Sequence, residues 1–407
     1  MLKLVLGTSG SGKTTLLYAR IRARAEAGKR SILLVPEQFT SSTEARIYRE
    51  LGDALSGMVE SYSFTSLAEH ILAIEGGAAV QTLTDAGRAV LVRRALEELQ
   101  DNVHYYYRHR RSAAFCQMAA ETIDELKSAG LSGQQLQELA RDCGTESAKL
   151  GELALIFQGY ESLLAGTGMD PADRLELAAD RLEAALARDE LPDFLREREV
   201  FIDEFDTFNA PKKRLMGAML AALPAVTVAL CEDGAPMQPG DLELFSGAKQ
   251  VAAQLRQLAR KNGAQVAAPE LLRRDLRHKD APGLAALTEL LETGSCTPPE
   301  SAPELRLFAA ASREEEARCA AAAIRRLMRQ GVRCGKIAVV CRDISQYRAA
   351  VRYEFRMAEI PLYCDEPTTP EFSAPATAVR ALLALLRGAD MTEQLTVLAK
   401  TGLCDLT

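Results

Sequence analysis

The chain has 407 residues, and its composition of 47% hydrophobic and 26% charged residues is typical of soluble globular proteins. A chain of this length predicts about two to three domains. No apolar run approaches the roughly 18 residues of a membrane-spanning helix, which argues against an integral membrane protein. The net charge of −7 does not indicate nucleic-acid binding, although an acidic protein can still have a local basic groove.

The nine cysteines are scattered, form no C-x-x-C pair and are accompanied by only four histidines, so a zinc site is not predicted. Scattered free thiols indicate a reducing compartment, and the expected location is the cytoplasm. Lys3 lies in the first predicted strand, which runs directly into a glycine-rich loop, and this arrangement leaves no room for a signal peptide.

The first predicted elements are a strand at residues 2–6, a glycine-rich loop and a helix at residues 15–27, which Gly28 ends. The loop matches the phosphate-binding pattern G-x-x-x-x-G-K-[ST] without a mismatch. In such a loop, backbone N–H groups and a helix N-terminus surround phosphate oxygens, the lysine reaches the β- and γ-phosphates, and the next hydroxyl ligates Mg²⁺. ATP and Mg²⁺ are therefore the expected cofactors, with Thr14 as a metal ligand. The predicted nucleotide-binding residues are Gly7, Thr8, Ser9, Gly10, Ser11, Gly12, Lys13, Thr14 and Thr15.

Short apolar runs at residues 31–35 and 58–61 predict two further strands of a parallel sheet, and residues 65–74 predict a helix. Polar and aromatic residues follow both runs, at the edge where open parallel sheets bind ligands. These side chains either contact a strand of DNA or pack the loops. They are Gln38, Phe39, Thr40, Tyr62, Ser63 and Phe64.

Between residues 84 and 187 apolar residues recur at helical spacing, which predicts an all-helical insertion of roughly 100 residues. Within it, the segment HYYYRHRR at residues 104–111 interleaves aromatic and basic side chains. Such a segment suits stacking on single-stranded nucleic acid combined with neutralisation of its backbone. We favour the alternative, a solvated charged segment whose tyrosines face the helical core.

Strands return at residues 200–202 and 226–230 and continue the first sheet, so the helical block interrupts one α/β domain. The first of these runs ends in Asp203 and Glu204. In phosphate-loop proteins the strand-end aspartate holds Mg²⁺, and an adjacent glutamate is well placed to polarise the attacking water. The pattern predicts Asp203 as the second metal ligand and Glu204 as the catalytic base.

The proline-rich segment TPPESAP at residues 297–303 predicts a linker. Beyond it the pattern predicts a second α/β domain. Its expected strands are residues 305–309, 336–341 and 360–363, and its expected helices are residues 314–328, 346–357 and 374–386.

An ordered series of motifs resembles the B subunit of the AddAB-type ATP-dependent helicase/deoxyribonuclease family over essentially the whole chain. Besides the phosphate loop, the series comprises LLVPEQFT at residues 33–40, SFTSLA at 63–68, TDAGR at 84–88, IDELK at 123–127, FIDEF at 201–205 followed by Thr207 and Phe208, AASREEE at 310–316, IAVVCRD at 337–343 and IPLYCD at 360–365.

The resemblance implies an α/β fold of the superfamily 1 helicase type, in which a RecA-like phosphate-loop domain carries an all-helical insertion and precedes a second RecA-like domain. In those terms, residues 1–83 and 190–296 form the phosphate-loop domain (1A-like), and residues 84–189 form the helical insertion (1B-like). Residues 304–407 form the beginning of a truncated second domain (2A-like).

The resemblance also implies a protein that processes DNA double-strand breaks for recombinational repair and scans single-stranded DNA for a Chi-like sequence. The implied partners are an A subunit, which is the motor and a nuclease, and single- and double-stranded DNA, without a membrane. The positions matching the family's DNA-reading residues are Gln38, Thr40, Phe64 and Phe205, whereas Ser66 and Glu69 depart from the family. The family's nuclease domain and its iron–sulfur cluster belong to a C-terminal part that this chain does not match.

Two departures concern catalysis. Cys231, Glu232 and Asp233 stand where active helicases place a glutamine that couples hydrolysis to movement. Glu204 stands where the family often has glycine, which is compatible with hydrolysis. The alternatives are a scaffold whose nucleotide is purely structural and a small-molecule phosphate-loop kinase, which the long insertion and the second domain disfavour.

Overall fold

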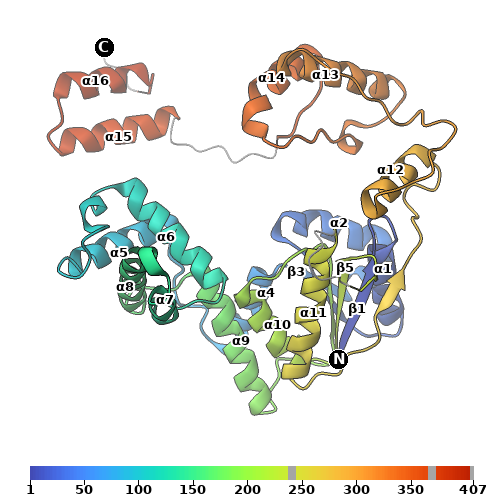
Figure 1. The fold of residues 1–407 in the computed structure, drawn as a ribbon, viewed down its shortest axis with the longest axis horizontal. Helices are drawn as coiled ribbons and strands as arrows, with labels where there is room; N and C mark the ends of the chain where they lie inside the picture. Colours follow the sequence, from blue (N-terminus) through green and yellow to red (C-terminus); the bar gives the residue numbers. More distant parts are fainter. Residues whose placement is uncertain (237–243, 365–372, 404–407) are drawn as a thin grey trace. The chain divides into compact units, whose positions relative to one another are not determined.

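The computed structural model describes residues 1–236, 244–364 and 373–403, which form two compact units, Met1–Leu305 and Arg306–Thr407 (Figure 1). The first unit contains a parallel six-stranded sheet in the order β3-β2-β4-β5-β1-β6, so the predicted α/β class with a parallel sheet is confirmed. The strands are β1 (Leu2–Gly7), β2 (Ser31–Leu34), β3 (Val59–Tyr62), β4 (Glu199–Ile202), β5 (Ala225–Cys231) and β6 (Glu270–Leu272).

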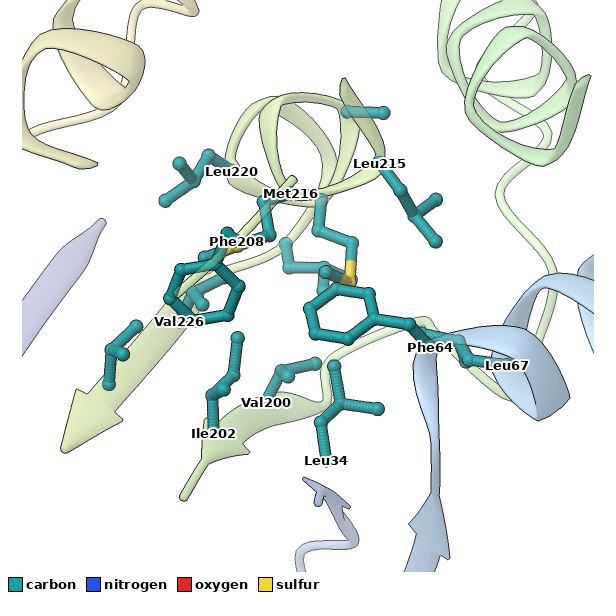
Figure 2. Close-up of a cluster of buried hydrophobic side chains, with 14 of the residues drawn as sticks. Leu34, Phe64, Leu67, Val200, Ile202, Phe208, Leu215, Met216, Leu220 and Val226 are labelled. Carbon is teal, nitrogen blue, oxygen red and sulfur yellow. The ribbon is translucent and has the colours of Figure 1, made fainter. Parts of the chain in front are cut away.

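Both faces of the sheet are covered, which explains why most of its strands consist largely of apolar residues. Along β1, Leu4 and Leu6 pack into one core and Val5 into the other. The helices over the Val5 face are α1 (Lys13–Glu26), α2 (Thr40–Leu51) and α3 (Asp53–Ser56), with the short 3₁₀ turn η1 (Glu37–Phe39) before α2. Those over the opposite face are α4 (Phe64–Glu75), α9 (Pro171–Ala187), α10 (Ala210–Ala222) and α11 (Ser246–Lys261). Figure 2 shows the larger of these two cores, between α10 and the sheet.

The helical insertion builds a hydrophobic core of its own. Its helices are α5 (Asp85–Glu98), α6 (Ala113–Ser128), α7 (Gly133–Ala140) and α8 (Ser147–Leu164), with 3₁₀ turns η2 (Tyr107–His109) and η3 (Gly144–Glu146). Phe157 and Tyr160 of α8 lie at the centre of this core. Helix α9, in contrast, places Leu175, Ala178 and Leu182 in the core beside the sheet.

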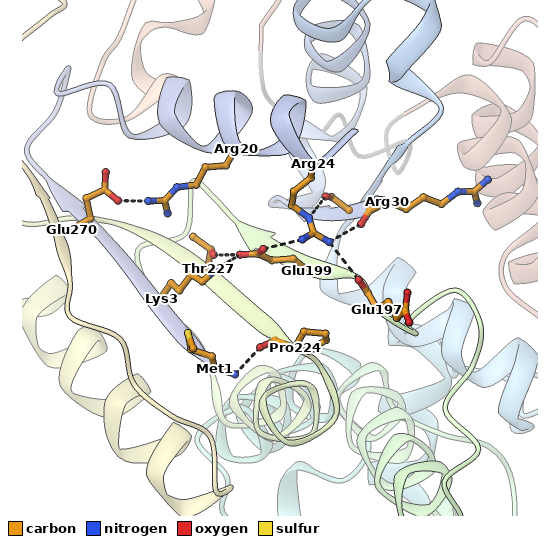
Figure 3. A network of polar contacts seen from close by, with 11 residues as sticks. Met1, Lys3, Arg20, Arg24, Arg30, Glu197, Glu199, Pro224, Thr227 and Glu270 are labelled. Carbon is orange, nitrogen blue, oxygen red and sulfur yellow. Dashed lines mark hydrogen bonds and ion pairs between the residues drawn. The ribbon is translucent and has the colours of Figure 1, made fainter. Parts of the chain in front are cut away.

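A polar network closes the amino end of the sheet (Figure 3). The Glu199 carboxylate is buried and accepts hydrogen bonds from Lys3 Nζ at 2.8 Å and Thr227 Oγ1 at 2.9 Å. Arg24 of α1 lies 3.3 Å from the same carboxylate, and its Nε also donates to Ser31 Oγ at 3.1 Å. One buried acid therefore connects β1, β4, β5 and α1 at this end of the sheet.

The second unit is helical in its described residues. Helices α13 (Arg313–Arg329) and α14 (Ile344–Met357) pack together, as do α15 (Ala374–Leu386) and α16 (Met391–Lys400), with a 3₁₀ turn η4 (Cys334–Lys336). The three predicted helices are confirmed, and α16 was not predicted. Helix α12 (Pro282–Thr293) belongs to the first unit.

The predicted strands of the second unit are wrong for the described residues: residues 305–309, 336–341 and 360–363 form no strand. A strand is stable only when its backbone N–H and C=O groups pair with a neighbour. Leu307, Val340 and Tyr363 are instead largely exposed. Asp365, the last residue of the IPLYCD motif, lies outside the described residues. Across the described part of the chain, no helix is long and apolar enough to cross a bilayer.

Candidate functional site

The phosphate loop joins β1 to α1 and needs its glycines. Gly10 and Gly12 have φ of 81° and 90°, in the left-handed region that other residues rarely adopt. Gly12 is the N-cap of α1, so the first free N–H groups of that helix face the loop. A Cβ at Gly7 would lie 2.8 Å from the backbone carbonyl oxygen of Leu272, so this close approach also requires glycine. The predicted strand, loop and helix are thus present in the predicted order.

Lys13 folds across the loop. Its Nζ donates to the carbonyl oxygens of Gly7 and Thr8, at 2.8 Å each. Burial lowers the pKa of Lys13, and the nearby Cys231 and Asp203 oppose that shift. Ser11 Oγ is buried and has no hydrogen-bond partner among the described residues. A confined ammonium group, an unpaired hydroxyl and a helix N-terminus fit a phosphate group.

The two predicted metal ligands are brought together at the end of β4. Asp203 is buried, its backbone N–H donates to the Leu34 carbonyl at 3.1 Å, and the Thr14 hydroxyl donates to its carboxylate. Burial raises the pKa of Asp203, while the hydrogen bond from Thr14 opposes this. No cluster of three His, Cys, Asp or Glu side chains suited to a metal occurs in the described residues. Thr14 and Asp203 fit Mg²⁺ only as partial ligands, completed by phosphate oxygens and water.

Glu204 follows Asp203 and is exposed toward solvent, with its own N–H donating to Asp203 Oδ1 at 3.0 Å. Its φ is 65°, a strained value for a residue with a side chain. Burial and the neighbouring Asp203 raise the pKa of Glu204, which Arg46 of α2 counteracts. Arg46 also lies over the Tyr18 ring, 4.9 Å from its centroid, and was not identified from the sequence.

A second segment, which the sequence patterns did not predict, also lines the phosphate loop. Strand β6 pairs with β1, and the chain that follows it crosses the loop. The Leu276 N–H donates to the Gly10 carbonyl at 3.0 Å, and Arg277 donates to Ser9 Oγ at 3.2 Å. The Thr8 hydroxyl bonds to the Glu292 carboxylate of α12. The only sequence signal was the basic run RRDLRHK at residues 273–279, after a strand too short to stand out.

Asp275 shapes this second segment. Its carboxylate accepts hydrogen bonds from the backbone N–H groups of Arg277 at 2.9 Å and His278 at 3.1 Å, and it lies 2.8 Å from His278 Nδ1. These contacts hold the turn that presents Arg277 to the phosphate loop. The arrangement places a guanidinium group beside the phosphate loop, a group that binds anions well.

The predicted DNA-reading residues follow three neighbouring strands, β3, β2 and β4, but they differ in exposure. Gln38 is exposed, and Thr40 is half-buried with its hydroxyl donating to the Glu37 carbonyl at 2.9 Å. Phe64 is only 2% exposed and Phe205 only 8%. The predicted stacking role of Phe64 is therefore at odds with its burial in this conformation.

Phe64 and Phe205 form an aromatic cluster with Phe208. The Phe64 and Phe205 ring centroids lie 5.3 Å apart in an edge-to-face arrangement, and Figure 2 shows Phe64 and Phe208 pointing into the core beneath α10. Lys212 lies over both Phe64 and Phe205, at 5.8 and 5.5 Å. The aromatic ring that is exposed at this edge is Phe39, at 36%.

The comparisons with known proteins agree on one family. The family model described as "ADDB, N-terminal" matches residues 4–288. The chain is 34% identical over 381 residues to the B subunit of the ATP-dependent helicase/deoxyribonuclease of Desulforudis audaxviator, covering 89% of this chain and 32% of the relative. The proteins of the same name from Moorella thermoacetica and Symbiobacterium thermophilum are 33% and 32% identical, over 89% and 94% of this chain and 32% and 34% of theirs.

The chain spans about a third of the length of the curated relatives it matches. The match to the family model covers well over half of the chain and includes the phosphate loop, the helical insertion and the strand that ends at Asp203. The resemblance that the ordered motifs indicated is thus confirmed, and the chain belongs to the ADDB N-terminal family.

Proposed function

We propose that the first unit binds ATP and Mg²⁺ at the phosphate loop, as the nucleotide-binding part of a helicase–nuclease complex. The observation that carries the proposal is the hydrogen bond between Thr14, at the start of α1, and the buried Asp203, at the end of β4. The two residues are 189 positions apart in the sequence, and their contact beside a loop suited to phosphate supports a role as a metal-binding pair. The names of the relatives, which refer to an ATP-dependent enzyme, support the same function.

In this proposal each residue has a defined task. The loop N–H groups, Lys13 and Arg277 hold the phosphates, and Thr14 and Asp203 hold Mg²⁺, which neutralises phosphate charge. Glu204 accepts a proton from the attacking water, for which its exposed carboxylate and raised pKa are suited. If Glu204 performs this task, the chain hydrolyses ATP slowly; if it does not, the nucleotide is structural.

The test of nucleotide binding is the Lys13→Ala variant. Loss of the ammonium group removes a charge-assisted contact worth roughly 1.5–3 kcal/mol, which weakens binding about ten- to a hundredfold. Titration with a fluorescent ATP analogue measures this, and Lys29→Ala, which removes an exposed lysine beyond the end of α1, serves as the matched control. Equal affinity of Lys13→Ala and the wild type would refute the site.

We further propose that the fold is of the superfamily 1 helicase type, with a RecA-like domain at residues 1–83 and 190–296, an insertion at 84–189, and a second RecA-like domain beginning near residue 304. The parallel sheet, the separate core of α5 to α8 and the division after Leu305 support this assignment. Because α9 packs on the sheet core, it is the element that connects the insertion to the first domain.

The DNA-related role follows from the family. We propose that the chain acts with an A subunit in processing DNA double-strand breaks, and that the edge at Gln38 and Thr40 contacts single-stranded DNA and reads a Chi-like sequence. Support comes from the exposure of Gln38 and of the neighbouring Phe39 ring, which offers a stacking surface.

Competition between oligonucleotides of different sequence, at fixed salt, tests this edge. Phe39→Ala is expected to weaken binding about tenfold and to change the ranking of sequences, because base stacking contributes about 1–3 kcal/mol. Phe64→Ala is the comparison, since its buried ring is expected to affect folding more than ranking. An unchanged ranking in Phe39→Ala would remove the case for a reading edge.

A further inference from the structure

The basic segment at residues 104–111 of the helical insertion is held rigidly by the insertion core. Glu152 of α8 accepts hydrogen bonds from the backbone N–H groups of His104 and Tyr105, at 2.9 Å each, and of Tyr106, at 3.1 Å. Tyr106 stacks on Phe115 with centroids 5.6 Å apart. Two of the three tyrosines, Tyr106 and Tyr107, pack against the core. The interpretation that we favoured from the sequence, in which the tyrosines face the helical core, predicted this packing.

The arginines of this segment differ in exposure. Arg108 and Arg111 are exposed, while Arg110 is half-buried with its guanidinium 3.8 Å from the centroid of the Tyr107 ring. Residues 102–120 contain no Asp or Glu, and the carboxylate of Glu152 is occupied by the backbone N–H groups. Within the described residues, no ion pair involves any of these three arginines.

Other arginines of the same insertion behave differently. Arg93 and Arg94 of α5 pair with Glu97 and Glu98, at 3.1 and 3.0 Å, one helical turn further along. Arg88 contacts Asp85 and Asp124 in the same way. In a protein of net charge −7, an unneutralised group of three arginines on an anchored segment is therefore a local exception that attracts anions.

We propose that Arg108, Arg110 and Arg111 form a contact for the phosphodiester backbone of DNA, independent of base sequence. Guanidinium groups bind phosphate oxygens in a bidentate manner, and these arginines need break no ion pair to do so. Tyr105 is 47% exposed beside them and adds an aromatic surface. The proposal rests on the proposed function in one respect, that DNA is the ligand. It is otherwise separate, because this contact lies on the helical insertion and not at the edge of the sheet.

The test uses the double variant Arg108→Ala/Arg111→Ala, with Arg93→Ala/Arg94→Ala as the matched control that removes the same charge from paired arginines. Binding of a fluorescent single strand of about 20 nucleotides and of a duplex of about 20 base pairs is measured by anisotropy from roughly 50 to 200 mM salt. The logarithm of the association constant falls linearly with the logarithm of the salt concentration. Each lost phosphate contact makes this slope less steep, by about 0.9 for duplex and about 0.7 for single strand. For Arg108→Ala/Arg111→Ala, the magnitude of the slope is expected to decrease by about 1.4–1.8, and the affinity is expected to fall roughly tenfold, equally for all DNA sequences.

The control variant is expected to keep the wild-type slope. Equal slopes for Arg108→Ala/Arg111→Ala and the wild type would overturn the proposal, and so would an equal loss in both double variants, which would indicate a general charge effect. If Arg108→Ala/Arg111→Ala kept its DNA binding but lost binding to phosphatidylserine vesicles, the ligand of the arginines would be a lipid surface and the DNA proposal would be overturned. Binding of the fluorescent ATP analogue, measured in the same samples, reports on the nucleotide site separately, so failure of one proposal is distinguishable from failure of the other.

Discussion

Strand β4 has a buried acid at its amino end and another just beyond its carboxyl end, and the two have opposite surroundings. Glu199 receives hydrogen bonds from Lys3 and Thr227 and lies beside Arg24; although burial alone would raise its pKa, these contacts lower it (Figure 3). Asp203 is equally buried, but its hydrogen bonds come from uncharged groups, the Thr14 hydroxyl and the Glu204 N–H, and burial raises its pKa.

The two ends of the sheet therefore differ in how the protein satisfies a buried acid. At the amino end a charged group is satisfied by the protein itself and stabilises the fold. At the carboxyl end a buried carboxylate, an unpaired Ser11 hydroxyl and a strained Glu204 backbone remain, which costs stability but leaves groups ready for a ligand. The following variants test this contrast, from the largest expected effect to the smallest.

The first variant, Glu204→Gln, removes the proposed base but keeps its shape. Any ATP turnover is expected to fall by about 10²- to 10⁴-fold, which is the usual contribution of general base catalysis. Binding of the fluorescent ATP analogue stays unchanged, because Thr14 and Asp203 are intact. Turnover at the wild-type rate would exclude Glu204 as the base.

The second variant, Glu199→Gln, weakens the satisfied end of the sheet. Loss of charge-assisted hydrogen bonds is expected to lower the free energy of unfolding by about 2 kcal/mol at pH 7, measured by urea denaturation. Glu26→Gln, an exposed acid at the end of α1, is the control and is expected to change little.

This effect depends on pH in a defined direction. Because the pKa of Glu199 is lower in the folded than in the unfolded state, its stabilising contribution is present above the unfolded pKa and is lost as the pH falls through the folded pKa. The difference between wild type and Glu199→Gln should therefore disappear at acidic pH. A difference that grew on acidification would contradict the assignment.

The third variant, Asp203→Asn, is expected to stabilise the fold by about 1 kcal/mol at pH 7, at the cost of Mg²⁺-dependent nucleotide binding. The pKa of Asp203 is raised on folding, so its protonated form supports the folded state at low pH and that support is lost as the pH rises through the folded pKa. The gain from Asn should thus be largest at neutral pH and vanish in acid. A loss of stability at pH 7 would show that Asp203 is structural.

The fourth variant, Glu204→Gly, relieves the backbone strain at φ 65°. Glycine adopts this region freely, although its greater freedom in the unfolded chain offsets part of the gain, so an increase of about 0.5–1 kcal/mol is expected. Glu204→Gln, which keeps the strain, is the control in the same denaturation experiment. A destabilised glycine variant would mean that the Glu204 side chain stabilises the turn.

Local patterns in the sequence were sufficient for the phosphate loop, the first five strands and the helical insertion. The glycines of the loop are dictated by backbone conformations that only glycine adopts easily, and most strands are largely apolar because both faces of the sheet are covered. Strand β6 escaped detection because it has three half-buried residues at the edge of the sheet. The apolar runs of the second unit predicted strands for which the described residues supply no pairing partner.

The sequence by itself determined which residues are candidates for binding phosphate and magnesium, since that assignment depends on residue type and on spacing within short segments. The tertiary structure alone decided that Arg277 reaches Ser9, that Phe64 is covered by Phe205 and Phe208, and that the arginines near residue 110 form no ion pair within the described part of the chain. The physical reason is that burial and pairing depend on contacts between segments far apart in the chain, and local periodicity contains no information on those contacts.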